Sequence, residues 1–132
     1  RKKMELESRK VRVSKSSSDV FKHLELLGSF EALMPESIEK FEIDKDSFIF
    51  GLKGMPEIRL VLKEKTPSSK IMLGAASSKM PFTLQIPIER VSDNISEVTL
   101  EFSGEFNPMI SMMVKKPLTN FIEALTDNLG KL

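Results

Sequence analysis

The chain contains no cysteine, no tryptophan, no tyrosine and a single histidine, His23, among its 132 residues. The absence of cysteine excludes disulfides, thiolate metal sites and cysteine nucleophiles, and it is typical of a reducing compartment such as the cytoplasm. One histidine is too few to build a zinc site or a histidine-dependent triad from local motifs. We therefore expect no metal site and no cofactor, and we expect His23 to lie at the boundary of the core.

The chain also lacks a large excess of charge of one sign and a long apolar run. The chain contains 20 Lys and Arg residues and 19 Asp and Glu residues, so its net charge is +1. This balance leaves no overall basic field to attract a nucleic-acid backbone or an anionic membrane. No apolar run approaches the roughly 20 residues of a membrane span, and the basic first residues lead into charged ones rather than into a signal-peptide core. The sequence predicts a cytoplasmic protein without nucleic-acid binding or integral membrane insertion.

Apolar residues recur at every second position in segment after segment between residues 41 and 106. This period is typical of half-buried strands in an antiparallel sheet with one dry face. Seven strands are predicted, over residues 5–14, 38–43, 48–53, 57–65, 70–77, 82–91 and 97–106. The residues expected on the dry face are Phe48, Phe50, Leu52, Ile58, Leu60, Leu62, Ile71, Leu73, Ala75, Phe82, Leu84, Ile86, Ile88, Val98, Leu100, Phe102 and Phe106. Pro87 and Gly104 interrupt this pattern and are interpreted as bends that curl the sheet.

Helix signals flank the predicted sheet. Ser16 can cap a helix that Gly28 ends, and Ser29 can cap a shorter helix that Pro35 stops. Asn107 followed by proline predicts the start of a long helix over residues 108–132. Its apolar stripe consists of Val114, Leu118, Phe121, Leu125, Leu129 and Leu132. We expect this helix to cover the dry face, and we expect Pro117 to kink it or reset it near Val114.

This order of elements resembles the START and birch-pollen-allergen superfamily (SRPBCC), whose fold is called the helix grip. The run from Ser16 to Phe21 is similar to the family's entry into its first helix, the run from Phe30 to Pro35 to its second, and the run from Asn107 to Met109 to the start of its long helix. The resemblance covers residues 1–132 as a single domain, and small bacterial polyketide-cyclase-like members are most similar. It implies an α+β fold in which a seven-stranded curved antiparallel sheet wraps around the C-terminal helix, with two short helices after the first strand.

The resemblance also implies an apolar cavity between the sheet and the long helix. We therefore expect non-catalytic binding or transport of a small hydrophobic or amphipathic ligand, lipid-like or polyketide-like. The candidate ligand-binding residues are Phe50, Leu60, Leu73, Phe82, Leu84, Met109, Ser111, Met112 and Met113.

Ser111 and the methionines allow two interpretations. Ser111 falls on the apolar stripe and is expected to look toward Phe50, Leu60 and Leu73. In one interpretation Ser111 leaves room above the sheet, and Met109, Met112 and Met113 form an adaptable rim together with Met55 and Met80. In the other, Pro117 rotates the first turns of the helix, so that the methionines fill the core.

Two further functions stay open. A cyclase- or dehydratase-like enzyme needs an ionisable group facing the cavity, and Glu57, Arg59 and His23 are the candidates for that role. A protein-interaction module would instead present the methionines to a protein partner as an exposed patch.

Overall fold

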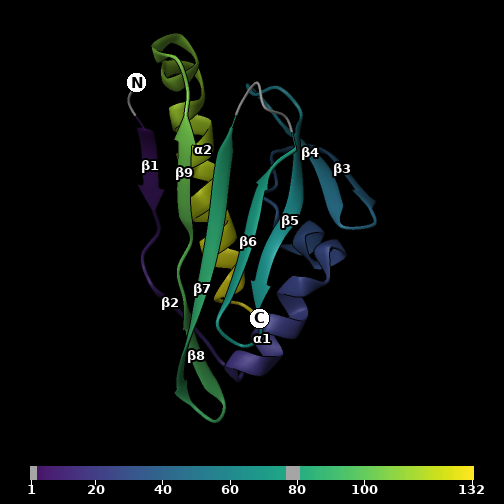
Figure 1. The fold of residues 1–132 in the computed structure, drawn as a ribbon, viewed down its shortest axis with the longest axis vertical. Coiled ribbons are helices and arrows are strands. Elements are labelled where there is room, and N and C mark those ends of the chain that lie inside the picture. Colours follow the sequence, from purple (N-terminus) through teal and green to yellow (C-terminus); the bar gives the residue numbers. More distant parts are fainter. Residues whose placement is uncertain (1–2, 77–80) are drawn as a thin grey trace.

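The computed structural model describes residues 3–76 and 81–132, which form a curved antiparallel sheet with the helices on one side of it (Figure 1). The described strands are β1 (Lys3–Glu7), β2 (Val11–Val13), β3 (Ile38–Asp44), β4 (Ser47–Leu52), β5 (Ile58–Thr66), β6 (Lys70–Ala75), β7 (Phe82–Ser92), β8 (Ile95–Val98) and β9 (Glu101–Glu105). The helices are α1 (Ser17–Glu25), the 3-10 helix η1 (Leu27–Leu33) and α2 (Pro108–Leu129). The fold class is therefore α+β, as predicted.

The strands follow the order β1-β9-β7-β6-β5-β4-β3, and β8 pairs with both β2 and β7. The long strand β7 pairs with β9 along its first half and with β8 along its second half. Pro87 lies where β7 changes partner, and its carbonyl accepts a hydrogen bond from the Thr99 amide. A residue without an amide hydrogen is tolerated at such a change of partner, because the strand bends there anyway.

The sheet has two more strands than predicted, because two predicted strands are each divided in the structure. Residues 5–14 contribute to β1 and β2, and residues 97–106 to β8 and β9. The two breaks lie next to each other on neighbouring strands. The Ser8 amide donates to the Leu100 carbonyl, and the Leu100 amide donates to Ser8 Oγ, both at 2.9 Å. A side-chain oxygen thus replaces a backbone carbonyl at this point, and the regular ladder stops.

The helix starts follow the predicted caps, whereas one helix end does not. Ser16 Oγ accepts a hydrogen bond from the Asp19 amide, and the Asn107 side chain accepts one from the Ile110 amide. However, α1 ends at Glu25, and Gly28 and Ser29 both lie inside η1. Ser29 Oγ donates to the His23 carbonyl at 2.7 Å, so its hydroxyl closes the end of α1 rather than capping a new helix.

Helix α2 continues through Pro117 without interruption. A proline inside a helix leaves the carbonyl four residues earlier without a donor. Here that carbonyl belongs to Met113, whose residue is 56% exposed, so water can satisfy it.

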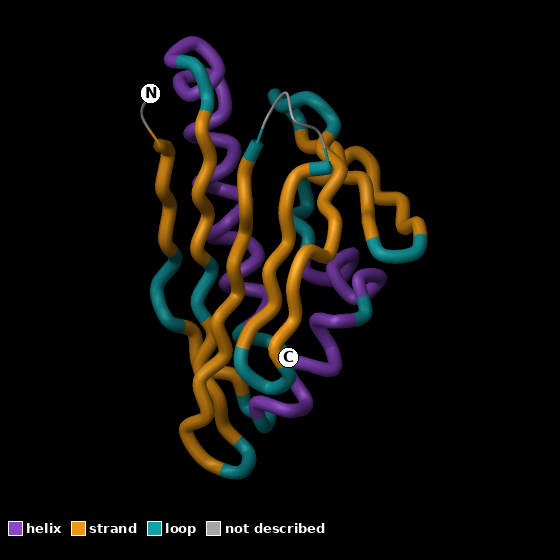
Figure 2. Tube along the Cα trace, viewed as in Figure 1, coloured by secondary structure: helices purple, strands orange, loops and turns teal. Residues whose placement is uncertain are grey.

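The dry face of the sheet is the one that the sequence predicts. Of the seventeen expected residues, all are buried except Leu62, Ala75 and Phe82, which are half-buried. Five phenylalanines connect the layers: Phe41 and Phe30 both stack on Phe48, which contacts Phe50, and Phe50 stacks on Phe121 of α2. Figure 2 shows the layers that these rings bridge, with the helices lying along one face of the strands.

A hydrogen bond from one side chain connects the C-terminal end of α2 to η1. Asn128 Nδ2 donates to the Leu33 carbonyl at 2.8 Å and lies 3.4 Å from the Met34 carbonyl, and both of these residues are buried. Replacing Asn128 by alanine removes this donor, so the Leu33 carbonyl loses its hydrogen bond from the side chain. We expect Asn128→Ala to lower the free energy of unfolding by about 1 kcal/mol, measured by urea denaturation. Asn120→Ala on the exposed side of the same helix is the control, and an equal loss there would contradict the assignment.

Candidate functional site

A groove of about 740 Å³ lies between the edge strand β1 and the first half of α2. We call it the β1 groove. It is lined by Lys3, Met4, Glu5, Leu6, Phe106, Pro108, Ser111, Met112 and Lys115. Several of these residues are exposed, so the groove is accessible from solvent. Its volume lies within the range of small-molecule sites, about 300–1,000 Å³.

The two walls of the β1 groove follow from the periods of a strand and a helix. Alternation along β1 leaves Lys3, Glu5 and Glu7 exposed and turns Met4 and Leu6 partly inward. On α2, the lining residues at positions 108, 111, 112 and 115 are spaced so that they share one face of the helix. The groove exists because β1 and this helix face lie side by side.

Aromatic residues underlie the groove where β9 passes into α2. Phe106 is 5% exposed and its ring lies 6.2 Å from that of Phe102, which in turn lies 5.2 Å from Phe82. Gly104, which pairs with Met4 of β1, has no side chain, and the Phe106 ring occupies the space beside it. A Cβ atom on residue 104 would lie 2.8 Å from the Phe106 ring.

The β1 groove joins this apolar lining to polar groups. Met4, Leu6, Phe106 and Met112 supply apolar surface, whereas Ser111 supplies a hydroxyl. The ion pairs formed among the described residues involve neither Lys3 nor Lys115. Both ammonium groups are therefore open to a ligand, and Glu5 is the one carboxylate among the described lining residues.

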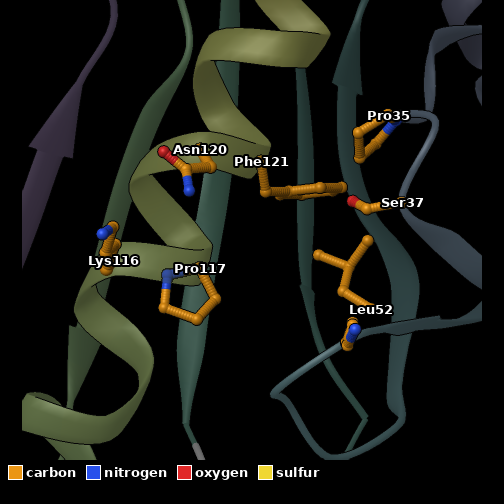
Figure 3. A pocket seen from close by; sticks show the side chains of 8 residues that line it. Pro35, Ser37, Leu52, Lys116, Pro117, Asn120 and Phe121 are labelled. Carbon is orange, nitrogen blue, oxygen red and sulfur yellow. The ribbon is translucent and has the colours of Figure 1, made fainter.

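A smaller cavity of about 270 Å³ lies on the other side of α2. We call it the Pro117 pocket; it is lined by Pro35, Ser37, Leu52, Lys53, Lys116, Pro117, Asn120 and Phe121. Figure 3 shows the Phe121 ring extending from α2 toward Ser37 and Leu52. Because Phe121 is 3% exposed and stacks on Phe50 at 4.8 Å, its ring fills the space between helix and sheet at this level.

The structure distributes the nine predicted site residues over four environments. Phe50, Leu60, Leu73 and Leu84 are at most 2% exposed and belong to the packed core. Ser111 and Met112 line the β1 groove, and Phe82 is half-buried beside Gly104. Met109 and Met113 are 79% and 56% exposed on the outer side of α2. Met55 is half-buried, and Met80 lies outside the described residues.

The three side chains considered for catalysis are dispersed. Glu57 pairs with Lys40 at 3.3 Å, and Arg59 donates to Ser47 Oγ at 2.7 Å. His23 is half-buried on α1, and its Nε2 atom has no hydrogen-bond partner among the described residues. None of the three lines the β1 groove or the Pro117 pocket.

Within residues 3–76 and 81–132, no group of three His, Asp or Glu side chains is placed to hold a metal ion. None of the helices described, including the 22-residue α2, combines the length and apolarity that a membrane crossing requires.

Sequence reasoning missed the β1 side of the groove. Lys3, Met4, Glu5 and Leu6 were not candidates, because the partner of the first strand cannot be read from local sequence. Two local signals were available: the alternation of Met4 and Leu6 along β1, and the helical spacing of residues 108, 111, 112 and 115.

Comparison with protein-family models and with curated protein sequences gave no match. Comparison with solved structures gave several across nearly the whole chain. Norcoclaurine synthase from Thalictrum flavum, in complex with dopamine and hydroxybenzaldehyde, is 14% identical with a TM-score of 0.73, over 98% of this chain and 85% of that one. A START superfamily protein from Mycobacterium smegmatis is 9% identical with a TM-score of 0.66, over 96% and 97%. A conserved protein from Geobacillus kaustophilus is 11% identical with a TM-score of 0.65, over 92% and 90%.

These identities are low, so the similarity concerns the fold and not the chemistry. Over nearly its whole length the chain is similar in fold to an enzyme and to a START superfamily protein. The chain has the helix-grip fold of START and birch-pollen-allergen-like proteins, as the order of its elements predicted.

Proposed function

We propose that the protein binds a small amphipathic molecule in the β1 groove without converting it chemically. The observation that carries this proposal is the composition of the groove, in which apolar and cationic side chains share one volume of about 740 Å³. A ligand with an apolar body and a polar or anionic end matches both parts. Lipid-like and polyketide-like molecules belong to this class.

The placement of the ligand follows from the lining. Its apolar body lies between Met4 and Leu6 of β1 and Met112 of α2, above the Phe106 ring. Methionine side chains suit this role, because they are flexible and polarizable and adapt to different shapes. An anionic end lies near Lys115, and the Ser111 hydroxyl can hydrogen-bond to it.

Binding without catalysis is favoured by where the ionisable groups lie. General acid or base catalysis needs a titratable group held against the substrate in a site that excludes water. The charged residues of the β1 groove, Lys3, Glu5 and Lys115, are all exposed at its margin. Norcoclaurine synthase is an enzyme with the same fold, so the fold itself permits either function.

The Ser111→Leu variant tests the β1 groove. A leucine at this half-buried position adds apolar volume to an open groove without displacing a packed neighbour. We expect binding of a fluorescent fatty-acid probe to weaken by about tenfold, which corresponds to roughly 1.4 kcal/mol. The melting temperature is expected to hold or rise, because the leucine buries apolar surface.

The matched control is Asn120→Leu, which places the same side chain on the Pro117 pocket side of the same helix. Probe binding is expected to stay at the wild-type level in this variant. Three results would count against the proposal: no probe binding by the wild type, equal loss in both variants, or a Ser111→Leu protein destabilised by about 1–3 kcal/mol as in an overpacked core.

A further inference from the structure

The exposed residues of α2 change in character along the helix. The first two turns present Met109, Met112 and Met113, whose exposed fractions are 79%, 83% and 56%. The exposed lysines Lys115 and Lys116 follow directly. Farther along the helix the exposed residues are Asn120, Glu123 and Asp127. The order is thus apolar, cationic, neutral and then acidic.

The methionines lie at one end of the molecule. In Figure 1 the first turns of α2 extend beyond the end of β9, at the same end as the turn between β4 and β5. That turn carries Lys53, which is exposed, and Met55, which is half-buried. The other exposed large apolar residues in the described part of the chain, Leu26, Ile43 and Val91, are separate from one another in the sequence and lie outside α2.

We propose that this end of α2 docks on the surface of an anionic lipid bilayer. Interfacial segments place apolar side chains about 5–10 Å into the boundary between headgroups and acyl chains, with lysines at the level of the lipid phosphates. The rise of an α-helix sets Lys116 about 5 Å beyond Met113 along the axis and Glu123 about 10 Å beyond Lys116. Lys116 therefore reaches the phosphates while Glu123, farther along α2, stays in water.

The electrostatics at this end fit an anionic surface. The ion pairs among the described residues use neither Lys116 nor Lys53, so both charges are available. Asp127, at the far end of the helix, pairs with Arg9. The net charge of +1 does not oppose this arrangement, because attraction to a membrane depends on the charges within about a Debye length of it.

A second copy of the chain fits the same surface less well. A symmetric contact between two such ends would bring the lysines of both copies together. Three methionines also offer far less area than the 1,200–2,000 Å² or so that specific protein interfaces bury. The lipid surface is therefore the occupant that agrees with both the charge and the small apolar area.

The test uses flotation of the full chain with phosphatidylcholine vesicles, with and without phosphatidylglycerol. We expect the wild type to float with the vesicles that contain phosphatidylglycerol and to be released as the salt concentration rises. The Met109→Gln/Met113→Gln double variant is expected to bind at least about tenfold more weakly, because two apolar side chains are lost. Lys116→Gln is expected to bind about fivefold more weakly at low salt.

The control is Leu26→Gln, which removes a side chain of comparable apolar size that is 68% exposed between α1 and η1. This variant is expected to float as the wild type does. Absence of flotation by the wild type, or equal loss in Leu26→Gln, would overturn the proposal. So would a vesicle-free dimer, seen by sedimentation equilibrium, that the double methionine variant dissociates.

Failure of this proposal and failure of the ligand proposal are distinguishable. Met109, Met113 and Lys116 do not line the β1 groove, so probe binding in the absence of vesicles is expected to be unchanged in these variants. Conversely, Ser111→Leu is expected to lose the probe and still float with the vesicles.

Discussion

Replacing Phe121 by alanine is expected to lower the free energy of unfolding by about 3–5 kcal/mol. The Phe121 side chain is 3% exposed, and its ring stacks on Phe50 at 4.8 Å with an interplanar angle of 8°. It is the aromatic contact that joins α2 to the row of rings on β4 and η1. The variant loses the buried ring, leaves a cavity that the rigid sheet cannot close, and loses the aromatic pair.

Urea denaturation followed by circular dichroism measures this effect. The control is Asn120→Ala, at the neighbouring exposed position of the same helix, where a change of less than about 0.5 kcal/mol is expected. A loss of less than about 1 kcal/mol for Phe121→Ala would mean that the ring does not fill the space between helix and sheet. The enclosed cavity implied by the family resemblance would then be the better candidate site.

Replacing Gly104 by valine is expected to cost about 3 kcal/mol, at the upper end of the range for overpacked cores. A Cβ atom there meets Phe106 Cζ at 2.8 Å and Phe82 Cβ at 3.0 Å. The Phe82 atom is attached directly to the backbone of β7, so it cannot move away alone. The Phe106 ring would have to shift, and because this ring lines the β1 groove, probe binding is expected to fall as well.

Gly74→Val is the matched control for this prediction. The three atoms nearest to a Cβ atom at Gly74 are Cγ, Cε and Cδ of Lys63, at 2.9–3.5 Å. This lysine is exposed and its stem can move aside. Valine also suits a strand better than glycine does, so we expect a change of less than about 1 kcal/mol, measured by urea denaturation. Equal losses of stability at both positions would show that valine destabilises the protein through its effect on the backbone and not through a clash with Phe106.

The sheet was predictable from sequence because its signal is local. Alternation fixes which residues of one strand share a face, and Phe48 and Phe50 needed no partner to be assigned to the core. The capping roles of Ser16 and Asn107 were predictable for the same reason, since a cap bonds to residues two or three positions away.

The features that were not predicted depend on contacts between distant residues. Whether residues 5–14 form one strand or two is decided by Ser8, whose hydroxyl bonds to Leu100. The β1 groove depends on the pairing of β1 with β9, which puts Met4 opposite Gly104. Likewise, Ser111 was expected to look toward Phe50, Leu60 and Leu73, whereas it lines the β1 groove together with residues of β1 that lie more than a hundred residues away in the chain.

The pairing of β1 with β9 also has a consequence for the order in which the protein folds. Ser8 and Leu100 are 92 residues apart, and α2 follows β9, so nearly the whole chain must be present before the β1 groove can form. Closing so long a loop is slow compared with the formation of the hairpins between β3 and β7. As an edge strand, β1 is held by hydrogen bonds on one side only. We therefore expect its amides to be among the last protected during refolding and among the first to exchange with deuterium in the native protein.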